Sequence, residues 1–387
     1  MMLPEPRFDA PDQNEMRGRL DRVRAMMAEK GLTHYVCASP DNVFYLTNFA
    51  NYVHERPFIL VVSLDAPLQF LVPKLEIPHV KARSVGDIDL IEYFEFPAPE
   101  GETWDAKFQT AFSSNARVGV ESICPLQVYQ AVPGERVRAD IVDDARMIKT
   151  DYEIARIVYA SDVATDAMNL LIASAKPGVG LMEINSKCRG LMLMKTLSDN
   201  PQANMLATSA TSVFQPPSVS HDPHNFTDVS MVMETDGPNV SIINGTLNGY
   251  GTEVERTFFL GDVPETCVKP YETMMEARRT AFDMAKPSVS MSTLDEACND
   301  VFKRAGYSDN LLHRTGHGIG VTGHEAPFFA EGYAREIKPG MVFTIEPGVY
   351  LPGIGGFRHS DTVLITEDGA ISLTPVADDL AAMTLYV

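Results

Sequence analysis

The sequence predicts two domains, an α/β domain over residues 1–148 and an α+β domain over residues 149–387. Three observations lead to this prediction. A chain of 387 residues exceeds one ordinary hydrophobic core. Helix-like and strand-like segments alternate through the first part, as in a domain with a central sheet. In the second part, long helices are interleaved with strands joined by Gly and Asn turns, which is typical of antiparallel pairing.

The elements of the first domain follow from the spacing of apolar residues. Met16, Leu20 and Val23 recur at helical spacing within residues 14–30, and Gly31 ends this helix. Short apolar runs then predict strands of a central sheet. Their sequences are HYVCA, FILVVS, LQFLVP and VGVES.

A long helix marks the start of the second domain. It begins near residue 150 and is closed by Pro177 and Gly178, so we place the domain boundary just before it. Further helices are expected over residues 181–198, 270–286 and 293–305. The strands interleaved with them are VSIINGTL, GYGTEVERTFFLG, MVFTIEPGVYL and TVLITEDGAISL.

Composition and charge argue against several classes of partner. Hydrophobic residues make up 45% of the chain, which is ample for a folded core. The formal net charge of -20 argues against nucleic acid and anionic membrane surfaces as partners. No apolar run approaches the ~18 residues of a membrane span, and the N-terminal segment lacks the profile of a signal peptide. Five scattered cysteines fit reduced thiols, so we expect a cytoplasmic protein.

The stretch LLHRTGHGIGVTGHEAPFF carries three histidines, His313, His317 and His324, and has the composition of part of a metal site. Together with FTIEPGVYLPGIGGFRHSDTVLIT and GYGTEVERTFFLG, it resembles the creatinase/prolidase/aminopeptidase P family. The resemblance covers the whole chain. It implies a smaller N-terminal domain followed by a catalytic domain of the pita-bread fold, with a curved, mainly antiparallel sheet.

The resemblance also implies where metal ligands would lie. Peptidases of this family bind two metal ions through two aspartates, one histidine and two glutamates. The matching positions in this sequence hold Ile242, Glu253, His317, Glu346 and Ser360. Two adjacent divalent ions need bridging carboxylates to offset their mutual repulsion. Ile242 and Ser360 supply none, and Glu253 is longer than the aspartate expected at its position, so the sequence predicts an enzyme without a metal cofactor.

Residues that resemble the metal-free branch of the family then become the candidates for catalysis. Glu255 stands in an ERT segment similar to one in creatinase, and His224 stands in a segment similar to that of creatinase's catalytic histidine. A histidine can shuttle protons at neutral pH, and a carboxylate can attack or activate water. We therefore expect Glu255 and His224 to be catalytic, with His221 as the alternative to His224.

The expected substrate combines a cation with a carboxylate, because a pocket of glutamates favours a cation and an arginine suits a carboxylate. Arg56 resembles a creatinase arginine that reaches the neighbouring subunit's active site, which implies a homodimer with a shared site. The predicted substrate-binding residues are Arg56, Glu253, His317, His324, Glu346 and His359. We expect His313 to be structural, and Arg358 to pair with Asp361 behind the site.

Among family members, the chain most resembles hydrolases that open the cyclic amidine ring of ectoine. We therefore predict a metal-independent hydrolase that converts ectoine to N-acetyl-2,4-diaminobutyrate. The product regioisomer, the acceptance of hydroxyectoine and the choice between a covalent Glu255 intermediate and activated water stay open. The alternatives are a creatinase-type amidinohydrolase, an Xaa-Pro metallopeptidase and a non-catalytic binding module. Bound metal and sensitivity to chelators would indicate the peptidase.

Overall fold

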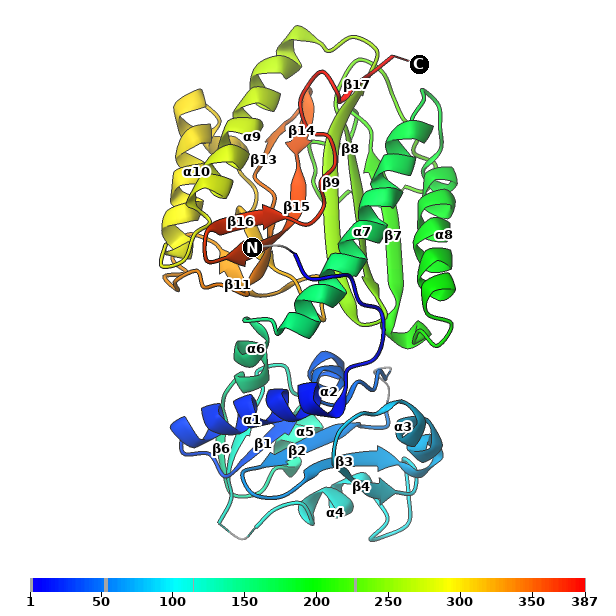
Figure 1. Cartoon of the computed structure of the whole chain (residues 1–387), viewed down its shortest axis with the longest axis vertical. Coiled ribbons are helices and arrows are strands. Elements are labelled where there is room, and N and C mark those ends of the chain that lie inside the picture. Colours follow the sequence, from blue (N-terminus) through cyan, green and yellow to red (C-terminus); the bar gives the residue numbers. More distant parts are fainter. Residues whose placement is uncertain (1–2, 52–54, 114, 226–227, 387) are drawn as a thin grey trace. The chain divides into compact units, whose positions relative to one another are not determined.

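The computed structural model describes residues 3–51, 55–113, 115–225 and 228–386 (Figure 1). The chain divides into two compact units. The smaller unit is Asp9–Arg146, and the larger unit combines Met1–Phe8 with Met147–Val387.

A mixed sheet forms the centre of the smaller unit. Within the described residues it has six strands in the order β4-β3-β2-β1-β5-β6. β1 is antiparallel to β2 and parallel to β5, and all of its residues are buried. The apolar runs of the sequence therefore supply the inner strands, as expected for a sheet covered on both faces. The strands are β1 (His34–Cys37), β2 (Ile59–Ser63), β3 (Leu68–Pro73), β4 (Ile88–Tyr93), β5 (Arg117–Val120) and β6 (Glu135–Arg138).

Short helices accompany this sheet, and α1 (Gln13–Glu29) is the longest of those described. Asp12 caps α1, because its side chain accepts a hydrogen bond from the Glu15 backbone N–H at 2.8 Å. Met16, Val23 and Met27 form its buried face, as their spacing predicts. The other helices are α2 (Pro40–Thr47), α3 (Ile77–Arg83), α4 (Trp104–Gln109), α5 (Leu126–Ala131) and α6 (Ile141–Arg146).

The larger unit is built on a second, mainly antiparallel sheet. Its main path runs β11-β10-β12-β15-β9-β8-β7, and β16 and β17 pair with β15 and β9. Among the described pairs of this sheet, only β17 with β9 is parallel. A separate hairpin joins β13 (Gly348–Leu351) to β14 (Gly355–Arg358). The sheet strands are β7 (Ser209–Gln215), β8 (Asn239–Leu247), β9 (Tyr250–Leu260), β10 (Gly316–Gly318), β11 (Glu325–Phe329), β12 (Val342–Ile345), β15 (Ser360–Thr366), β16 (Gly369–Ser372) and β17 (Thr384–Leu385).

Four long helices flank this sheet: α7 (Asp151–Ser174), α8 (Leu181–Asp199), α9 (Glu265–Met284) and α10 (Met291–Ala305). Figure 1 shows α7 and α8 beside β7 to β9, and α9 and α10 beside β13 and β16. A capping box between Thr150 and Glu153 starts α7. The sequence predicts α9 from Pro270, but the helix begins at Glu265 and continues through the proline. A proline this close to the N-terminus leaves only one nearby carbonyl without its helical partner.

The first residues of the chain belong to the larger unit, although the sequence assigns them to the N-terminal domain. The Arg7 backbone N–H donates to the Ala155 carbonyl at 3.0 Å. The Phe8 carbonyl accepts hydrogen bonds from the side-chain amides of Asn200 and Asn248 at 2.9 and 3.2 Å. These contacts attach the N-terminal segment to α7 and to the turn between β8 and β9. Within the described residues, no helix is long and apolar enough to cross a membrane.

Candidate active site

Strand β9 carries two glutamates at the centre of the larger sheet. Glu253 and Glu255 are two residues apart, so the pleat places both side chains on the same face of the strand. Both side chains are buried, and each has a carboxylate oxygen within 4.8 Å of a carboxylate oxygen of Glu346. Glu346 follows β12 directly, and its backbone N–H donates to the Thr315 carbonyl at 2.8 Å. Three buried carboxylates therefore converge in the larger unit.

Arg358, at the end of β14, brings a positive charge into this cluster. Its Nε forms a short ion pair with a carboxylate oxygen of Glu255, and both side chains are buried. One terminal nitrogen also donates to the Tyr350 hydroxyl at 3.2 Å, which lies 2.7 Å from Nε2 of His313. Nδ1 of His313 lies 2.8 Å from the Arg314 carbonyl, which fixes this nitrogen as the donor. His313 is thus structural in these contacts, as predicted, but it belongs to the network behind Glu255.

Glu253 is held by neutral groups of β15. The Ser360 hydroxyl donates to its carboxylate at 3.0 Å, and Thr362 bonds both backbone groups of Glu253, at 2.8 and 2.9 Å. In the strand register, Glu255 lies between Ile242 on β8 and Ser360 on β15. The family resemblance leads us to expect carboxylates at these two flanking positions, but the chain has Ile242 and Ser360 there. Glu255 therefore lies between two positions that lack the expected carboxylates.

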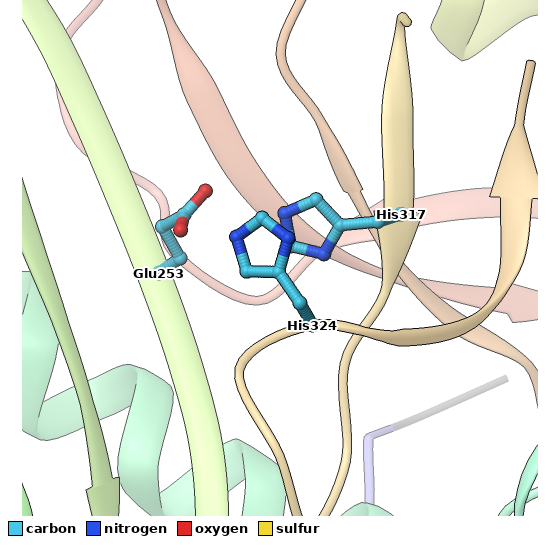
Figure 2. Close-up of side chains that lie close together, drawn as sticks. All are labelled: Glu253, His317 and His324. Atoms are coloured by element: carbon cyan, nitrogen blue, oxygen red, sulfur yellow. The ribbon is translucent and has the colours of Figure 1, made fainter. Parts of the chain in front are cut away.

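His317, on β10, lies across from these carboxylates. Nδ1 lies 3.0 Å from the Gly318 carbonyl, and Nε2 lies 3.1 Å from a carboxylate oxygen of Glu346. Nε2 is buried and has no hydrogen bond to any residue that the structure describes. The ring of His324 stacks on that of His317, with ring centroids 3.6 Å apart. Figure 2 shows the two rings lying one over the other beside Glu253.

His324 lies in the loop between β10 and β11, on the open side of the cluster. Its side chain is exposed, whereas those of Glu253 and His317 are buried. The next residue, Glu325, forms a buried ion pair with Lys149 at 2.9 Å. This pair anchors the loop to the segment before α7 and leaves Glu325 outside the cluster.

Burial and neighbouring charges separate the pKa values of these groups. Burial, together with the other carboxylates, raises the pKa of Glu253 and of Glu255, although Arg358 opposes the shift. Burial alone would lower the pKa of His317, but the Glu346 carboxylate raises it to about 9. Burial would likewise raise the pKa of Glu346, but His317 holds it below its usual range. Burial and the charge of His317 lower the pKa of His324 to about 4.

The predicted catalytic histidine lies on the open side of the cluster. His224 is an exposed residue in a turn, close enough that its charge lowers the pKa of His313 and of His324, after the larger effect of burial. His221 lies in the preceding turn and is only half-exposed. The structure thus brings His224 toward His324 and leaves its catalytic role a prediction.

Of the predicted substrate-binding residues, His359 packs away from the carboxylates and Arg56 belongs to the smaller unit. His359 is fully buried, with Nε2 3.3 Å from the Tyr271 hydroxyl and 3.4 Å from the Thr257 carbonyl, so it packs away from the carboxylates. Arg56 lies in the smaller unit and pairs with Glu95 and, at 3.3 Å, with Glu55. Its proposed reach into a neighbouring subunit stays a prediction.

The predicted pairing of Arg358 with Asp361 is wrong. Asp361 pairs with Arg256 at 2.9 Å and with Arg278 at 2.6 Å. The sequence reasoning therefore missed Arg358 and its partner Tyr350 as members of the site. The signal was available for Arg358, because it lies two residues before Ser360, and alternate residues of an extended chain share a face.

These observations define a two-domain protein with a hydrolase-like centre of histidine and carboxylates on a half-barrel sheet. The model of metallopeptidase family M24 matches residues 155–367, and that of the creatinase/prolidase N-terminal domain matches residues 19–177. The chain belongs to metallopeptidase family M24. The predicted fold class, an α/β domain with an α+β pita-bread domain, is confirmed.

Individual relatives support the same family assignment. The Xaa-Pro dipeptidase of Pyrococcus furiosus is 28% identical over 94% of this chain and 100% of its own length. A putative dipeptidase of Bacillus subtilis, YkvY, is 28% identical over 94% of this chain and 99% of its own length. The crystal structure of the prolidase from Pyrococcus horikoshii matches with a TM-score of 0.79 and 25% identity, over 94% of this chain and 99% of that one.

These relatives contradict the predicted opening of the ectoine ring. They are dipeptidases and prolidases by name, so they favour the alternative of an Xaa-Pro peptidase. Metal independence and ectoine as the substrate find no support in them either. What the family does support is an enzyme of the hydrolase class.

The residues present do not fit the two-ion centre that the family resemblance implies. Ile242 is a buried aliphatic side chain, and the Ser360 hydroxyl is neutral and donates to Glu253. Glu255, which lies between them, is paired with Arg358. The residues do fit a single ion, because ligand atoms of Glu253, His317 and His324 lie within 4.8 Å of one another. Nε2 of His317, which pairs with Glu346 at 3.1 Å, lies at the same place.

Proposed function

We propose that the chain hydrolyses the amide bond of a short peptide, as an Xaa-Pro dipeptidase does. The observation that carries the proposal is the meeting of Glu253, His317 and Glu346 in one buried centre beside the exposed ring of His324. Relatives named Xaa-Pro dipeptidase align with nearly the whole chain, including both domains.

The charge of the centre suits the free ammonium group of such a peptide. Within the described residues, three buried glutamates face two positive groups, the guanidinium of Arg358 and the imidazole of His317. An excess of buried negative charge is stabilised by any cation that enters. A dipeptide brings its α-ammonium group next to the bond to be cleaved, so this group can approach Glu253 while the amide carbonyl lies near His324.

The chemistry then divides among a few side chains. When bound, a divalent ion supplies Lewis acidity toward a carbonyl oxygen and lowers the pKa of water. Glu346 stays a carboxylate at neutral pH and can hold the attacking water by accepting a hydrogen bond from it. His324 is neutral there, and its exposed ring can donate a hydrogen bond to the carbonyl oxygen. His224 is proposed to return a proton to the leaving nitrogen.

Substrate profiling tests this proposal. Purified protein is incubated with Ala-Pro, Met-Pro, Ala-Ala and creatine, and with ectoine as a comparison, each with and without added Mn²⁺ or Zn²⁺. We expect cleavage of at least one dipeptide, detected as free amino acids. Ring opening of ectoine without cleavage of any dipeptide would overturn the proposal, and inactivity toward every compound would favour a non-catalytic binding module.

The shared active site that Arg56 suggests is tested separately. If Arg56 of one subunit completes the centre of the other, an Arg56→Ala protein mixed with a Glu253→Gln protein should regain activity through mixed dimers. A Glu95→Gln protein is the control, because it removes the partner of Arg56 and keeps the arginine. Full activity of Arg56→Ala alone would contradict a shared site.

A further inference from the structure

We propose that this centre binds one divalent cation and not two, through Glu253 and His317 with His324 as a third ligand. The inference rests on the proposed function, since it concerns the metal of the same site. Its readout is the number of ions bound per chain, which needs no substrate.

The first step concerns the ion that the centre can hold. The Gly318 carbonyl lies 3.0 Å from Nδ1 of His317, which keeps a proton on Nδ1 and leaves Nε2 for another partner. Nε2 lies 3.1 Å from a carboxylate oxygen of Glu346, and without a metal the two form an ion pair. A divalent ion can displace the proton of Nε2 and bind at this nitrogen, because a histidine ligand must be deprotonated. Glu253 supplies the next oxygen, within 4.8 Å.

The second step concerns the ion that the centre cannot hold. A second ion needs bridging carboxylates, and the flanking strands offer Ile242 and Ser360 in the register positions on either side of Glu255. The Glu255 carboxylate is close enough, but Arg358 forms a buried ion pair with it. Separating that pair would leave a buried guanidinium uncompensated.

The charges agree with this count. The pair of Glu255 with Arg358 is neutral, which leaves Glu253 and Glu346 as the two carboxylates that can offset the ion once it has displaced the proton of His317. One divalent ion balances them, and a second would add two positive charges without an anion. The ligand set of imidazole and carboxylate suits Zn²⁺, Mn²⁺, Co²⁺ or Fe²⁺.

His324 gives the site an exchangeable ligand. Its ring lies nearly parallel to that of His317, at 18°, so one ion cannot lie in both ring planes at once. Because the His324 side chain is exposed, it can turn about its own bonds to reach the ion. We therefore expect His317 to contribute more to ion binding than His324.

The experiment counts ions on the full-length protein. The protein is stripped with chelator, titrated with Mn²⁺ and with Zn²⁺ by calorimetry, and analysed for bound metal after gel filtration. We expect one ion per chain. Glu253→Gln and His317→Ala should weaken binding by about 100-fold or more, and His324→Ala by about 10-fold. His79→Ala is the control, because this exposed histidine lies in the smaller unit.

A restoring variant sharpens the test. Ile242→Asp combined with Ser360→Glu returns two carboxylates to the positions beside Glu255, and we expect it to bind two ions. Two ions or none on the unchanged protein would overturn the proposal, and so would one ion that His317→Ala still binds with full affinity. Dipeptide cleavage together with two bound ions would reject the ion count and keep the proposed function. One bound ion without cleavage of any dipeptide would keep the ion count and reject the proposed function.

Discussion

Two charge clusters lie next to each other along β9 and β15, and they differ in how completely their charges are matched. The first contains Arg256, Arg278, Asp361 and Asp378, joined by ion pairs of 2.6–2.9 Å. Arg256 also donates to three backbone carbonyls besides that of Glu255. Two arginines and two aspartates balance each other, so this cluster has no need of a further ligand.

The second cluster, with Glu253, Glu255, Glu346, Arg358 and His317, is not balanced. Among the described residues, three carboxylates face one guanidinium and the imidazole of His317, whose Nε2 lies 3.1 Å from Glu346 without hydrogen-bonding geometry. Both clusters use adjacent residues of the same strands, such as Glu255 and Arg256. The comparison teaches that burial alone does not mark a functional site. Unmatched charge and unsatisfied atoms distinguish the centre from the network that supports it.

The largest expected effect comes from the unbalanced cluster. Glu253→Gln keeps the hydrogen bond from Ser360 possible but removes one charge, so we expect dipeptide turnover to fall about 1,000-fold. The free energy of unfolding should stay equal or rise, because a buried carboxylate with a raised pKa opposes folding when ionised. Glu367→Gln, at an exposed turn position, is the matched control. Turnover within a factor of about 3 of the unchanged protein would refute the role of Glu253.

A substitution in the balanced cluster should lower the stability of the protein. Asp361→Asn leaves Arg256 and Arg278 without their shared anion, so we expect a loss of about 3–5 kcal/mol in the free energy of unfolding, measured in urea. The surface pair of Asp300 with Lys303 provides the control, and Asp300→Asn should cost less than about 1 kcal/mol. Equal losses in the two variants would contradict a supporting role for Asp361.

The sequence predicts the clusters only in part, for reasons of geometry. Glu253 and Glu255 could be placed on one face, because the period of a strand is two residues. His359 and Asp361 were misplaced because each lies next to a residue of the centre in the sequence, and neighbours in an extended chain point to opposite faces. Arg278 comes from α9, and no local pattern indicates which carboxylate it contacts.

The same contrast applies to the fold. The capping box at Thr150 and the turns of the antiparallel sheet are local signals, and the helices and strands follow them closely. The attachment of Arg7 to Ala155 depends on residues far apart in the sequence, and it could not be predicted. Substrate class was also beyond the sequence pattern. The same glutamates suit a cyclic amidine or a peptide ammonium group, because both are cations.

A smaller effect is expected for the two residues predicted to be catalytic from the family resemblance. Glu255→Gln weakens the ion pair with Arg358, and His224→Ala removes an exposed imidazole whose charge acts on His324. We expect each to lower dipeptide turnover by about 100-fold while substrate still binds. His221→Ala separates the two candidate histidines and should change turnover little. A larger loss in His221→Ala than in His224→Ala would exchange their roles.

The smallest expected effect is a difference in pH dependence between the clusters. Arg256 and Arg278 outweigh burial and lower the folded pKa of Asp361 below its ordinary 3.8. Its stabilising contribution is therefore complete above pH 3.8 and is lost as the pH falls through the lowered value. Burial raises the folded pKa of Glu253 above its ordinary 4.5, so its contribution is complete below pH 4.5 and is lost as the pH rises through the raised value.

Urea unfolding between pH 3 and pH 7 measures the contributions of Asp361 and Glu253, each as the difference in free energy of unfolding between the variant and the unchanged protein. The deficit of Asp361→Asn should stay constant from pH 7 to about pH 5 and shrink below pH 3.8. Any advantage of Glu253→Gln should be greatest at pH 7 and shrink toward pH 4.5. The opposite signs follow from the surroundings, since two guanidinium groups enclose Asp361 whereas other carboxylates surround Glu253. Taken as variant minus unchanged protein, the free-energy difference should rise toward zero for Asp361→Asn and fall toward zero for Glu253→Gln as the pH is lowered. If these signed differences both rose or both fell, the distinction between a balanced and an unbalanced cluster would fail.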